Sequence, residues 1–232
     1  MRTIFRITLK IVLYFFLSTI AVVIIYRWVN PPLTYLMVKR YIEHSGENKP
    51  AILTKKWKRI EDISPNLIYA VVASEDAKFM QHNGLDLESM QKVMHSNKKG
   101  KRLKGASTIS QQTAKNVFLW PARNYIRKGF EAYFTILIET LWGKKRIMEV
   151  YLNVIEMGRG IYGAEAASQK YFNKSAKSLT RREAALIASI LPSPLKRNPK
   201  NPSNYMLKKQ KWILANMIHL EKINFVEKKS KN

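Results

Sequence analysis

A segment rich in hydroxyl, amide and lysine side chains is the part of this sequence with the clearest chemical potential. It runs from Gly105 to Asn116, reads GASTISQQTAKN, and contains no acidic residue. A helix that only fills a core repeats apolar residues every three or four positions, whereas this segment offers hydrogen-bond donors over most of its surface. Its composition indicates a surface that holds a polar, anionic group. A solvated helix with a serine cap explains the same residues equally well.

Two glutamates stand out by position. Glu75 ends a helix that is expected to begin with Ser64 as its N-cap. The negative end of that helix raises the proton affinity of a carboxylate, as a general base requires. Glu131 follows Arg127 and Lys128 by four and three residues, so an ordinary ion pair within a helix explains it more simply. Taken alone, each glutamate is better explained as a structural residue than as a catalytic one.

The chain is strongly basic, with 41 Lys and Arg residues, 16 Asp and Glu residues, and a net charge of +25. From Ser89 onward, every charged residue before Glu131 is basic. Such a charge concerns partners rather than fold. The candidates are nucleic acid, an anionic membrane surface and a phosphorylated substrate.

The N-terminal segment decides among these candidates. Between Lys10 and Arg27 lie the uncharged residues IVLYFFLSTIAVVIIY. As a helix, the 20 residues from Lys10 to Val29 span about 30 Å, which is enough to cross a hydrocarbon core. The basic start would also suit a signal peptide, but no small-x-small cleavage site follows. We therefore predict a permanent single-span anchor and a membrane-surface partner, with no nucleic acid.

The remaining sequence predicts an all-α or nearly all-α protein, because alternating β patterns are scarce. We predict a cytoplasmic tail at 1–10, a transmembrane anchor at 11–29, a connector at 30–50, a globular domain at 51–222 and a basic tail at 223–232. Helices are expected at 124–142, at 145–156, after a Thr180–Glu183 capping box and at 204–220, with a proline-rich loop at 191–202.

Five segments occur in the order and spacing seen in peptidoglycan glycosyltransferases: EDAKFMQHNG, GASTISQQTAKN, RKGFE, KKRIMEVYLN and RREAALIASILPSP. The resemblance covers roughly residues 50–220 and is closest to the monofunctional, single-span members of this family. It implies a mainly α fold, with a lysozyme-like helical domain and a small membrane-apposed jaw, on the periplasmic side of a cell inner membrane. The implied activity is polymerisation of lipid II into β-1,4-linked glycan strands with release of undecaprenyl pyrophosphate, in cell wall biogenesis.

The resemblance also implies roles for residues of these motifs. Glu75 would accept the proton of the attacking sugar 4-hydroxyl, and Glu131 would orient cations or a divalent metal at the diphosphate. The diphosphate and sugars would be bound by Ser107, Gln111, Gln112, Lys115, Asn116, Arg123, Arg127 and Lys128. Supporting roles would fall to Asp76, Phe79, His82, Lys144 and Glu149, with Lys144 and Glu149 in one buried network. No tightly bound cofactor is expected, and Mg²⁺ or Mn²⁺ at the substrate diphosphate stays open.

The expected partners are lipid II, the growing lipid-linked glycan and membrane lipids, while cell-division or elongation proteins stay open. The polybasic segment 93–104 would contact lipid head groups or form a solvated loop. Two other functions fit the sequence less well. A membrane-anchored lytic enzyme has no need of a cationic diphosphate site, and a non-catalytic scaffold has no need of Glu75 and Glu131.

Overall fold

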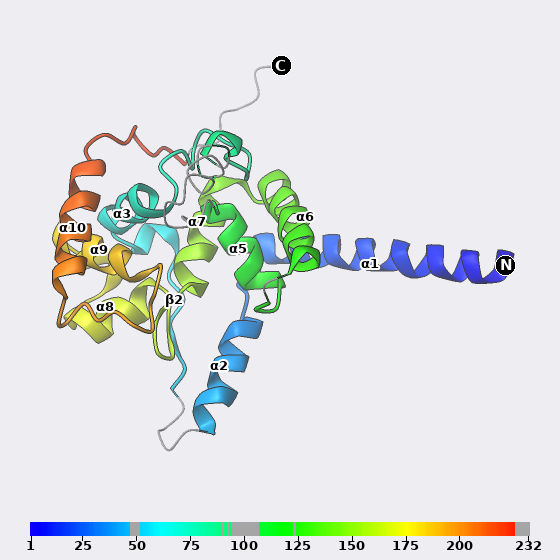
Figure 1. Cartoon of the computed structure of the whole chain (residues 1–232), viewed down its shortest axis with the longest axis horizontal. Helices are drawn as coiled ribbons and strands as arrows, with labels where there is room; N and C mark the ends of the chain where they lie inside the picture. The colour runs from blue at the N-terminus through cyan, green and yellow to red at the C-terminus, as the bar shows by residue number, and fades with distance from the viewer. Residues whose placement is uncertain (47–51, 90, 92, 94–106, 123, 226–232) are drawn as a thin grey trace.

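The computed structural model describes residues 1–46, 52–89, 91, 93, 107–122 and 124–225. This part of the chain is mainly helical, as predicted, and carries one small sheet (Figure 1). Residues 94–104 of the polybasic segment, Arg123 and most of the predicted basic tail lie outside the described residues.

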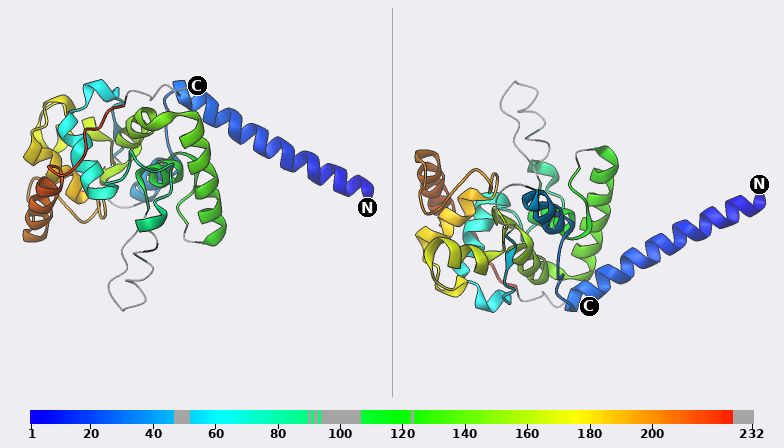
Figure 2. Two further views of the ribbon diagram at one scale, coloured as in Figure 1. Left: turned by 90° about the horizontal axis from the view of Figure 1, so that it is seen from above. Right: turned by 90° about the horizontal axis from the view of Figure 1, so that it is seen from below.

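The N-terminal helix α1 spans Arg2–Trp28 and is long and apolar enough to cross a membrane. It begins at Arg2, so the residues predicted as a tail continue the same helix. Its N-terminal part projects away from the domain (Figures 1 and 2), while its C-terminal part packs against α6 (Tyr125–Leu141). There the Thr19 and Tyr133 hydroxyls are 2.8 Å apart, and Trp142 Nε1 donates to the Val23 carbonyl at 2.7 Å. This helix is consistent with a membrane anchor.

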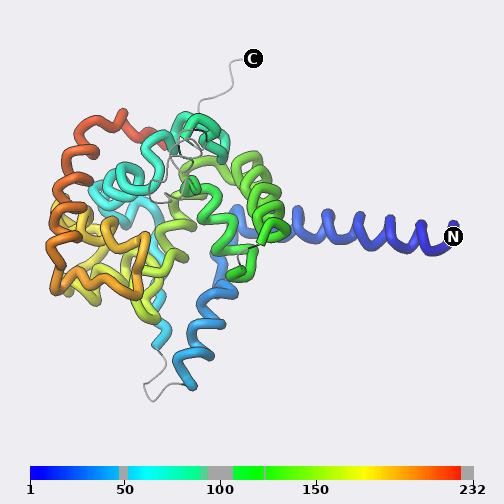
Figure 3. The backbone as a smooth tube through the Cα atoms, viewed as in Figure 1, coloured from blue at the N-terminus to red at the C-terminus, as the bar shows by residue number. Residues whose placement is uncertain are grey.

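The predicted connector contains a second helix, α2 (Tyr35–Ser45), which runs in a different direction from α1 (Figure 3). Thr34 caps it by accepting a hydrogen bond from the Met37 backbone N–H at 3.3 Å. Met37 and His44 lie seven residues apart on its buried face, and the helix contacts α5 (Ile109–Phe118). The connector is therefore packed on the domain.

The helices of the globular domain form two packed groups. On the side away from α1, α3 (Pro65–Glu75) and α10 (Asn204–Asn216) both pack on α9 (Arg181–Ile190) (Figure 1). Nearer to α1, α5 packs against both α6 and α7 (Gly143–Val154). The shorter elements are α8 (Ala164–Phe172) and the 3-10 turns η1 (Ile60–Asp62) and η2 (Ala176–Ser178).

Most of the predicted helices are confirmed with small changes at their ends. The helix predicted at 145–156 is α7, two residues earlier at each end, and α10 ends at Asn216 rather than at residue 220. The capping box is confirmed: Thr180 Oγ1 accepts from the Glu183 backbone N–H at 3.4 Å, and the Glu183 carboxylate accepts from the Thr180 backbone N–H at 2.9 Å. Pro65 opens α3 as predicted, but the hydroxyl of Ser64 donates to the Leu179 carbonyl instead of capping the helix.

The sheet has the strand order β1-β3-β2, with β1 at Thr54–Lys55, β2 at Glu156–Gly158 and β3 at Ile161–Tyr162. β1 pairs with β3 in parallel, and β2 pairs with β3 in antiparallel. These short strands join the segment that follows the connector to the region between α7 and α8. The centre of the core is α7, whose residues 147–154 are all buried except the half-buried Glu149.

Candidate active site

Asp76 fixes the end of α3 against the start of α5. It directly follows Glu75, the last residue of α3, and its Oδ2 accepts from the backbone N–H of Ile109, the first residue of α5, at 3.0 Å. A carboxylate is favourable at a helix N-terminus, where backbone N–H groups lack partners within the helix. Nδ1 of His82 accepts from the Gly84 backbone N–H at 3.0 Å, so Nε2 carries the proton that it donates to Asp76 at 3.0 Å. Asp76 and His82 therefore position Glu75.

Gly84 ties the loop after α3 to both α5 and α6. Its carbonyl accepts from the Thr108 hydroxyl at 2.6 Å. Its φ angle is +93°, and an added Cβ would lie 2.6 Å from Cγ2 of Thr135. A side chain at this position would be strained by the backbone and would also clash with α6. This glycine allows the loop to lie flat against α6 at the start of α5.

Gln111, which the resemblance placed at the substrate, is used inside the protein. It is 2% exposed. Its Oε1 accepts from the Thr108 backbone N–H at 3.0 Å, and Thr108 Oγ1 accepts from the Gln111 backbone N–H at 3.1 Å. This reciprocal pair is a capping box that satisfies the first N–H groups of α5. Gln111 therefore supports the site by holding α5 and does not line it.

Gln112 connects Glu75 to the face of α5. Its Nε2 donates to Glu75 Oε2 at 3.0 Å, and its Oε1 accepts from the Tyr151 hydroxyl at 3.3 Å. Burial raises the pKa of the Glu75 carboxyl, while hydrogen bonds from Gln112 and Ser74 act in the opposite direction. Glu75 is thus a half-buried carboxylate with increased proton affinity, which is the property that a general base needs.

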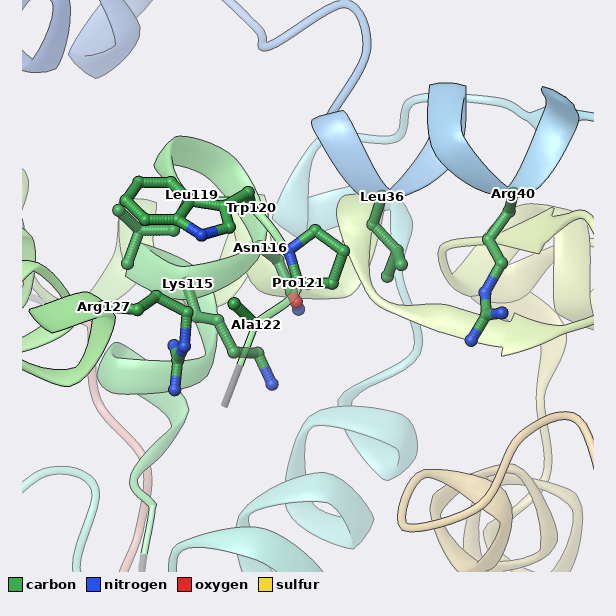
Figure 4. Close-up of a pocket in the computed structure, with 9 residues that line it drawn as sticks. All are labelled: Leu36, Arg40, Lys115, Asn116, Leu119, Trp120, Pro121, Ala122 and Arg127. Carbon is green, nitrogen blue, oxygen red and sulfur yellow. The ribbon is translucent and has the colours of Figure 1, made fainter. Parts of the chain in front are cut away.

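A cavity of about 470 Å³ lies one turn further along α5. Its lining comes from α2, α5, the loop after α5 and α6 (Figure 4): Leu36, Arg40, Lys115, Asn116, Leu119, Trp120, Pro121, Ala122 and Arg127. Among the described residues, its lining contains three cations and no acid. Burial lowers the pKa of the Lys115 ammonium, and the charge of Glu131 partly opposes that effect.

Glu131 holds two of the predicted cations. It is 2% exposed, and its Oε2 accepts from Arg127 Nη1 at 2.6 Å while its Oε1 is paired with Lys128. The ion pairs expected from the sequence spacing are confirmed. Both carboxylate oxygens are therefore occupied by cations, and one of these, Arg127, lines the cavity. Within the described part of the chain, no group of three His, Cys, Asp or Glu residues could hold a metal ion.

The buried network predicted between Lys144 and Glu149 is instead two separate ion pairs. Lys144 Nζ lies 2.6 Å from Glu139 Oε1, and Arg146 Nη1 lies 2.5 Å from Glu149 Oε1. Lys144 pairs with Glu139 of α6, and Glu149 pairs with Arg146 of its own helix α7. The Lys144 ammonium also lies 4.6 Å from the centre of the buried Phe79 ring, so Phe79 and Lys144 support the loop that follows Glu75.

Comparison with known proteins identifies the family. The sequence model of the family described as Transglycosylase matches residues 43–218. The chain belongs to the transglycosylase family. Three curated relatives are biosynthetic peptidoglycan transglycosylases from Bdellovibrio bacteriovorus, Caulobacter vibrioides and Bacteroides thetaiotaomicron. The chain is 54%, 51% and 49% identical to them, over 88%, 91% and 99% of its own length and 82%, 92% and 92% of theirs. The predicted peptidoglycan glycosyltransferase activity in cell wall synthesis is confirmed by the family and by these names.

In this transglycosylase the structure brings together most of the residues that the sequence singled out. The end of α3 carries Glu75, and α5 carries Gln112, Lys115 and Asn116. The adjoining helix α6 carries Arg127, Lys128 and Glu131. Ser107 is exposed just before the cap of α5. Arg123 lies outside the described residues, so its predicted role stays a prediction.

Sequence reasoning missed the part of the cavity formed by α2. Leu36 and Arg40 lie in the segment predicted as a connector, and they face Lys115 and Asn116 across the cavity (Figure 4). A signal was available. Thr34 is a good N-cap, and the buried residues that follow it recur at helical spacing.

Proposed function

We propose that this transglycosylase joins lipid II units into β-1,4-linked glycan strands, with Glu75 as the general base and the cationic cavity as the diphosphate site. The observation that carries the proposal is that Glu75, at the end of α3, and Lys115 both lie at one face of α5. Gln112, hydrogen-bonded to Glu75 at 3.0 Å, lies three residues before Lys115 on that helix. A base and a cationic anion site side by side are what transfer from a sugar diphosphate to a hydroxyl requires.

Glu75 supports the role of base through its environment. In the proposed step, the 4-hydroxyl oxygen of one lipid-linked disaccharide attacks C1 of the other substrate from the face opposite the diphosphate. The hydroxyl proton passes to the Glu75 carboxylate as the new C–O bond forms. A sugar hydroxyl is a weak nucleophile, so removal of its proton in the transition state lowers the barrier. The raised proton affinity of Glu75 matches that task.

The cavity supports departure of the diphosphate. The bond between C1 and the phosphate oxygen breaks, and undecaprenyl diphosphate leaves with the electron pair. Positive charge fixed where negative charge develops stabilises such a transition state. Lys115 and Arg127 line the cavity from two helices, and Asn116 adds an amide donor. An acid in this lining would repel the leaving group.

We propose that Glu131 acts by holding Arg127 and Lys128 in place, not by moving a proton. Its two oxygens are already paired with these cations. A divalent metal ion placed against Glu131 would compete with both of them. If Mg²⁺ or Mn²⁺ takes part, we expect it to be carried mainly by the oxygens of the substrate diphosphate.

We also propose that α1 crosses the inner membrane once and that the domain lies on the periplasmic side. The apolar length of α1 supports the anchor, and the packing of its C-terminal part on α6 supports a catalytic domain held at the membrane surface. Lipid II carries its diphosphate next to a polyprenyl chain, so a site close to the membrane suits this substrate.

The decisive experiment is polymerisation by the full-length protein in detergent or nanodiscs. Purified lipid II is supplied with and without Mg²⁺, and the products are separated by length and digested with a muramidase. We expect glycan chains that a muramidase cleaves, together with released undecaprenyl diphosphate. Shortening of preformed glycan without chain growth would show a lytic enzyme and overturn the proposal.

A further inference from the structure

The cavity has a wall that belongs to none of the motifs on which the family resemblance rests. Leu36 and Arg40 reach it from α2, the helix between the anchor and the domain (Figure 4). Met37 and His44 lie on the same face of α2 as these two residues and are buried, which fixes the helix on the domain. Arg40 is therefore presented to the cavity by a helix that is capped, packed and connected directly to α1.

Arg40 is only partly satisfied by the protein. Its Nη1 donates to Glu43 Oε2 at 3.0 Å. Its Nε lies 3.6 Å from Glu156 Oε1, which is an ion pair beyond hydrogen-bond distance. Among the described residues, this buried Nε has no hydrogen-bond partner. Glu43 and Glu156 therefore hold the guanidinium by charge, and its Nε–H lies beside Glu156 without completing a hydrogen bond.

Two further residues that line this cavity also carry a buried donor without a hydrogen-bond partner among the described residues. In the described part of the chain, Asn116 Nδ2 and Arg127 Nε also have no hydrogen-bond partner. Buried polar groups are normally paired, so three unpaired donors from three different helices around one cavity need an explanation. A ligand with several acceptor oxygens would satisfy them together.

The charge and size of the cavity indicate what that ligand is. Its three charged residues that the structure describes are Arg40, Lys115 and Arg127. Arginine presents donors in a planar fork that matches phosphate oxygens, and pairs of this kind are stronger than neutral hydrogen bonds. A cavity of about 470 Å³ leaves room for a diphosphate and the groups that flank it. Ordered water would supply acceptor oxygens but no negative charge to the three cations that line the cavity.

We propose that Arg40 is a third cationic ligand for the diphosphate of the lipid-linked substrate, so that α2 is a wall of the substrate site. This inference rests on the proposed function, which assigns the cavity to that diphosphate. Arg40 lines the cavity from α2, whereas Lys115 and Arg127 line it from α5 and α6, so a diphosphate in the cavity would be held by cations from three helices. The helix that follows the membrane anchor then contributes directly to substrate binding.

A purely structural role for Arg40 makes a different prediction. In that case its purpose would be to tie α2 to β2 through Glu156. Replacing Glu156 would then disturb the site as much as replacing Arg40. If Arg40 binds substrate, Glu156→Gln releases the guanidinium toward the cavity and leaves the affinity for a diphosphate unchanged or stronger.

The test uses the full-length protein and two measurements. The first is the Kd of a short-chain polyprenyl diphosphate, with the matching monophosphate for comparison. The second is the KM and kcat for lipid II. The variants are Arg40→Gln, Arg40→Lys, Glu156→Gln and the control Lys39→Gln. Lys39 lies on the same helix, 3.5 Å from the same Glu43, and does not line the cavity.

We expect Arg40→Gln to weaken diphosphate binding by about tenfold and to raise the KM for lipid II by a similar factor, with a smaller effect on kcat. Arg40→Lys should recover part of the loss, and Lys39→Gln should match the wild-type protein. A wild-type Kd in Arg40→Gln would overturn the proposal, as would an equal loss in Glu156→Gln. If the KM rose while the diphosphate Kd stayed unchanged, Arg40 would bind another anionic group of lipid II, and its assignment to the diphosphate would be overturned. If the wild-type protein neither bound the diphosphate nor polymerised lipid II, the proposed function itself would fail.

Discussion

Replacing Glu75 by glutamine tests the proposed base with little change in shape. The amide can still accept the hydrogen bond that Gln112 donates to Glu75 Oε2 at 3.0 Å, so α3 and α5 stay connected. What the variant loses is the ability to take a proton. General-base catalysis typically contributes about 10²–10⁴-fold, which corresponds to about 2.7–5.4 kcal/mol of activation free energy. We expect kcat to fall by a factor in this range, with a small change in KM.

The pKa of Glu75 provides a second readout. Because burial raises it above the ordinary value of a glutamate, the acidic limb of the kcat/KM profile should lie at a higher pH than the usual titration of a carboxylate. Glu75→Gln should flatten that limb. A carboxyl whose pKa is raised by folding favours the folded state below its unfolded pKa, and this contribution is lost as the pH rises through the folded pKa. At neutral pH the amide therefore removes a desolvated charge, and Tm should be unchanged or higher.

The assay is continuous polymerisation of fluorescent lipid II, accompanied by thermal unfolding of each variant. Glu61→Gln is the matched control, since Glu61 is an exposed glutamate that pairs with Lys145 at 2.6 Å and lies outside the site. Wild-type kcat in Glu75→Gln would refute the assignment of the base. Loss of activity together with a large drop in Tm would refute the claim that the substitution keeps the structure.

Three further predictions concern the support of the site. Asp76→Ala leaves the Ile109 backbone N–H buried without its partner, which should cost about 1–3 kcal/mol of unfolding free energy in denaturant titration. An unchanged midpoint would contradict that role. In Gly84→Ala the added methyl group would be strained by the φ of +93° and would clash with the Thr135 side chain, so we expect Tm to fall by several degrees. A wild-type Tm would show that the loop shifts freely. Because burial lowers the pKa of Lys115, diphosphate affinity should begin to fall at a lower pH than for an ordinary lysine. Lys115→Arg should remove this dependence, and an identical pH profile in that variant would exclude Lys115 as its source.

Local patterns predicted much of the fold because a few residues determine each helix end. The capping box at Thr180 and the spacing of Arg127, Lys128 and Glu131 act within one turn of helix, so their geometry follows from the sequence alone. The same reasoning could have found the capping box of α5. Thr108 and Gln111 have the required spacing, and that observation would have moved Gln111 from the substrate to the cap.

Contacts between distant segments could not be predicted in this way. Asp76 meets Ile109 across 33 residues, and nothing in either local sequence indicates the pairing. Lys144 and Glu149 were expected in one buried network, but Glu149 pairs with Arg146 three residues earlier in α7, and Lys144 pairs with Glu139 of α6. Charged residues have many partners in reach, and only the packing of the helices decides which of them meet.

The two glutamates show how the environment separates the roles of identical residues. Both are largely removed from water, but Glu75 receives hydrogen bonds from neutral groups, whereas Glu131 is paired with two cations. For Glu75 the cost of burying a charge raises the pKa, so the group can accept a proton. At Glu131 both carboxylate oxygens are instead paired with cations, Arg127 and Lys128. The proposed roles, proton transfer at Glu75 and charge placement at Glu131, match these different neighbours. Burial lowers the pKa of Lys115, the negative charges of both glutamates oppose that effect, and Lys115 lies between the proposed base and the proposed diphosphate site.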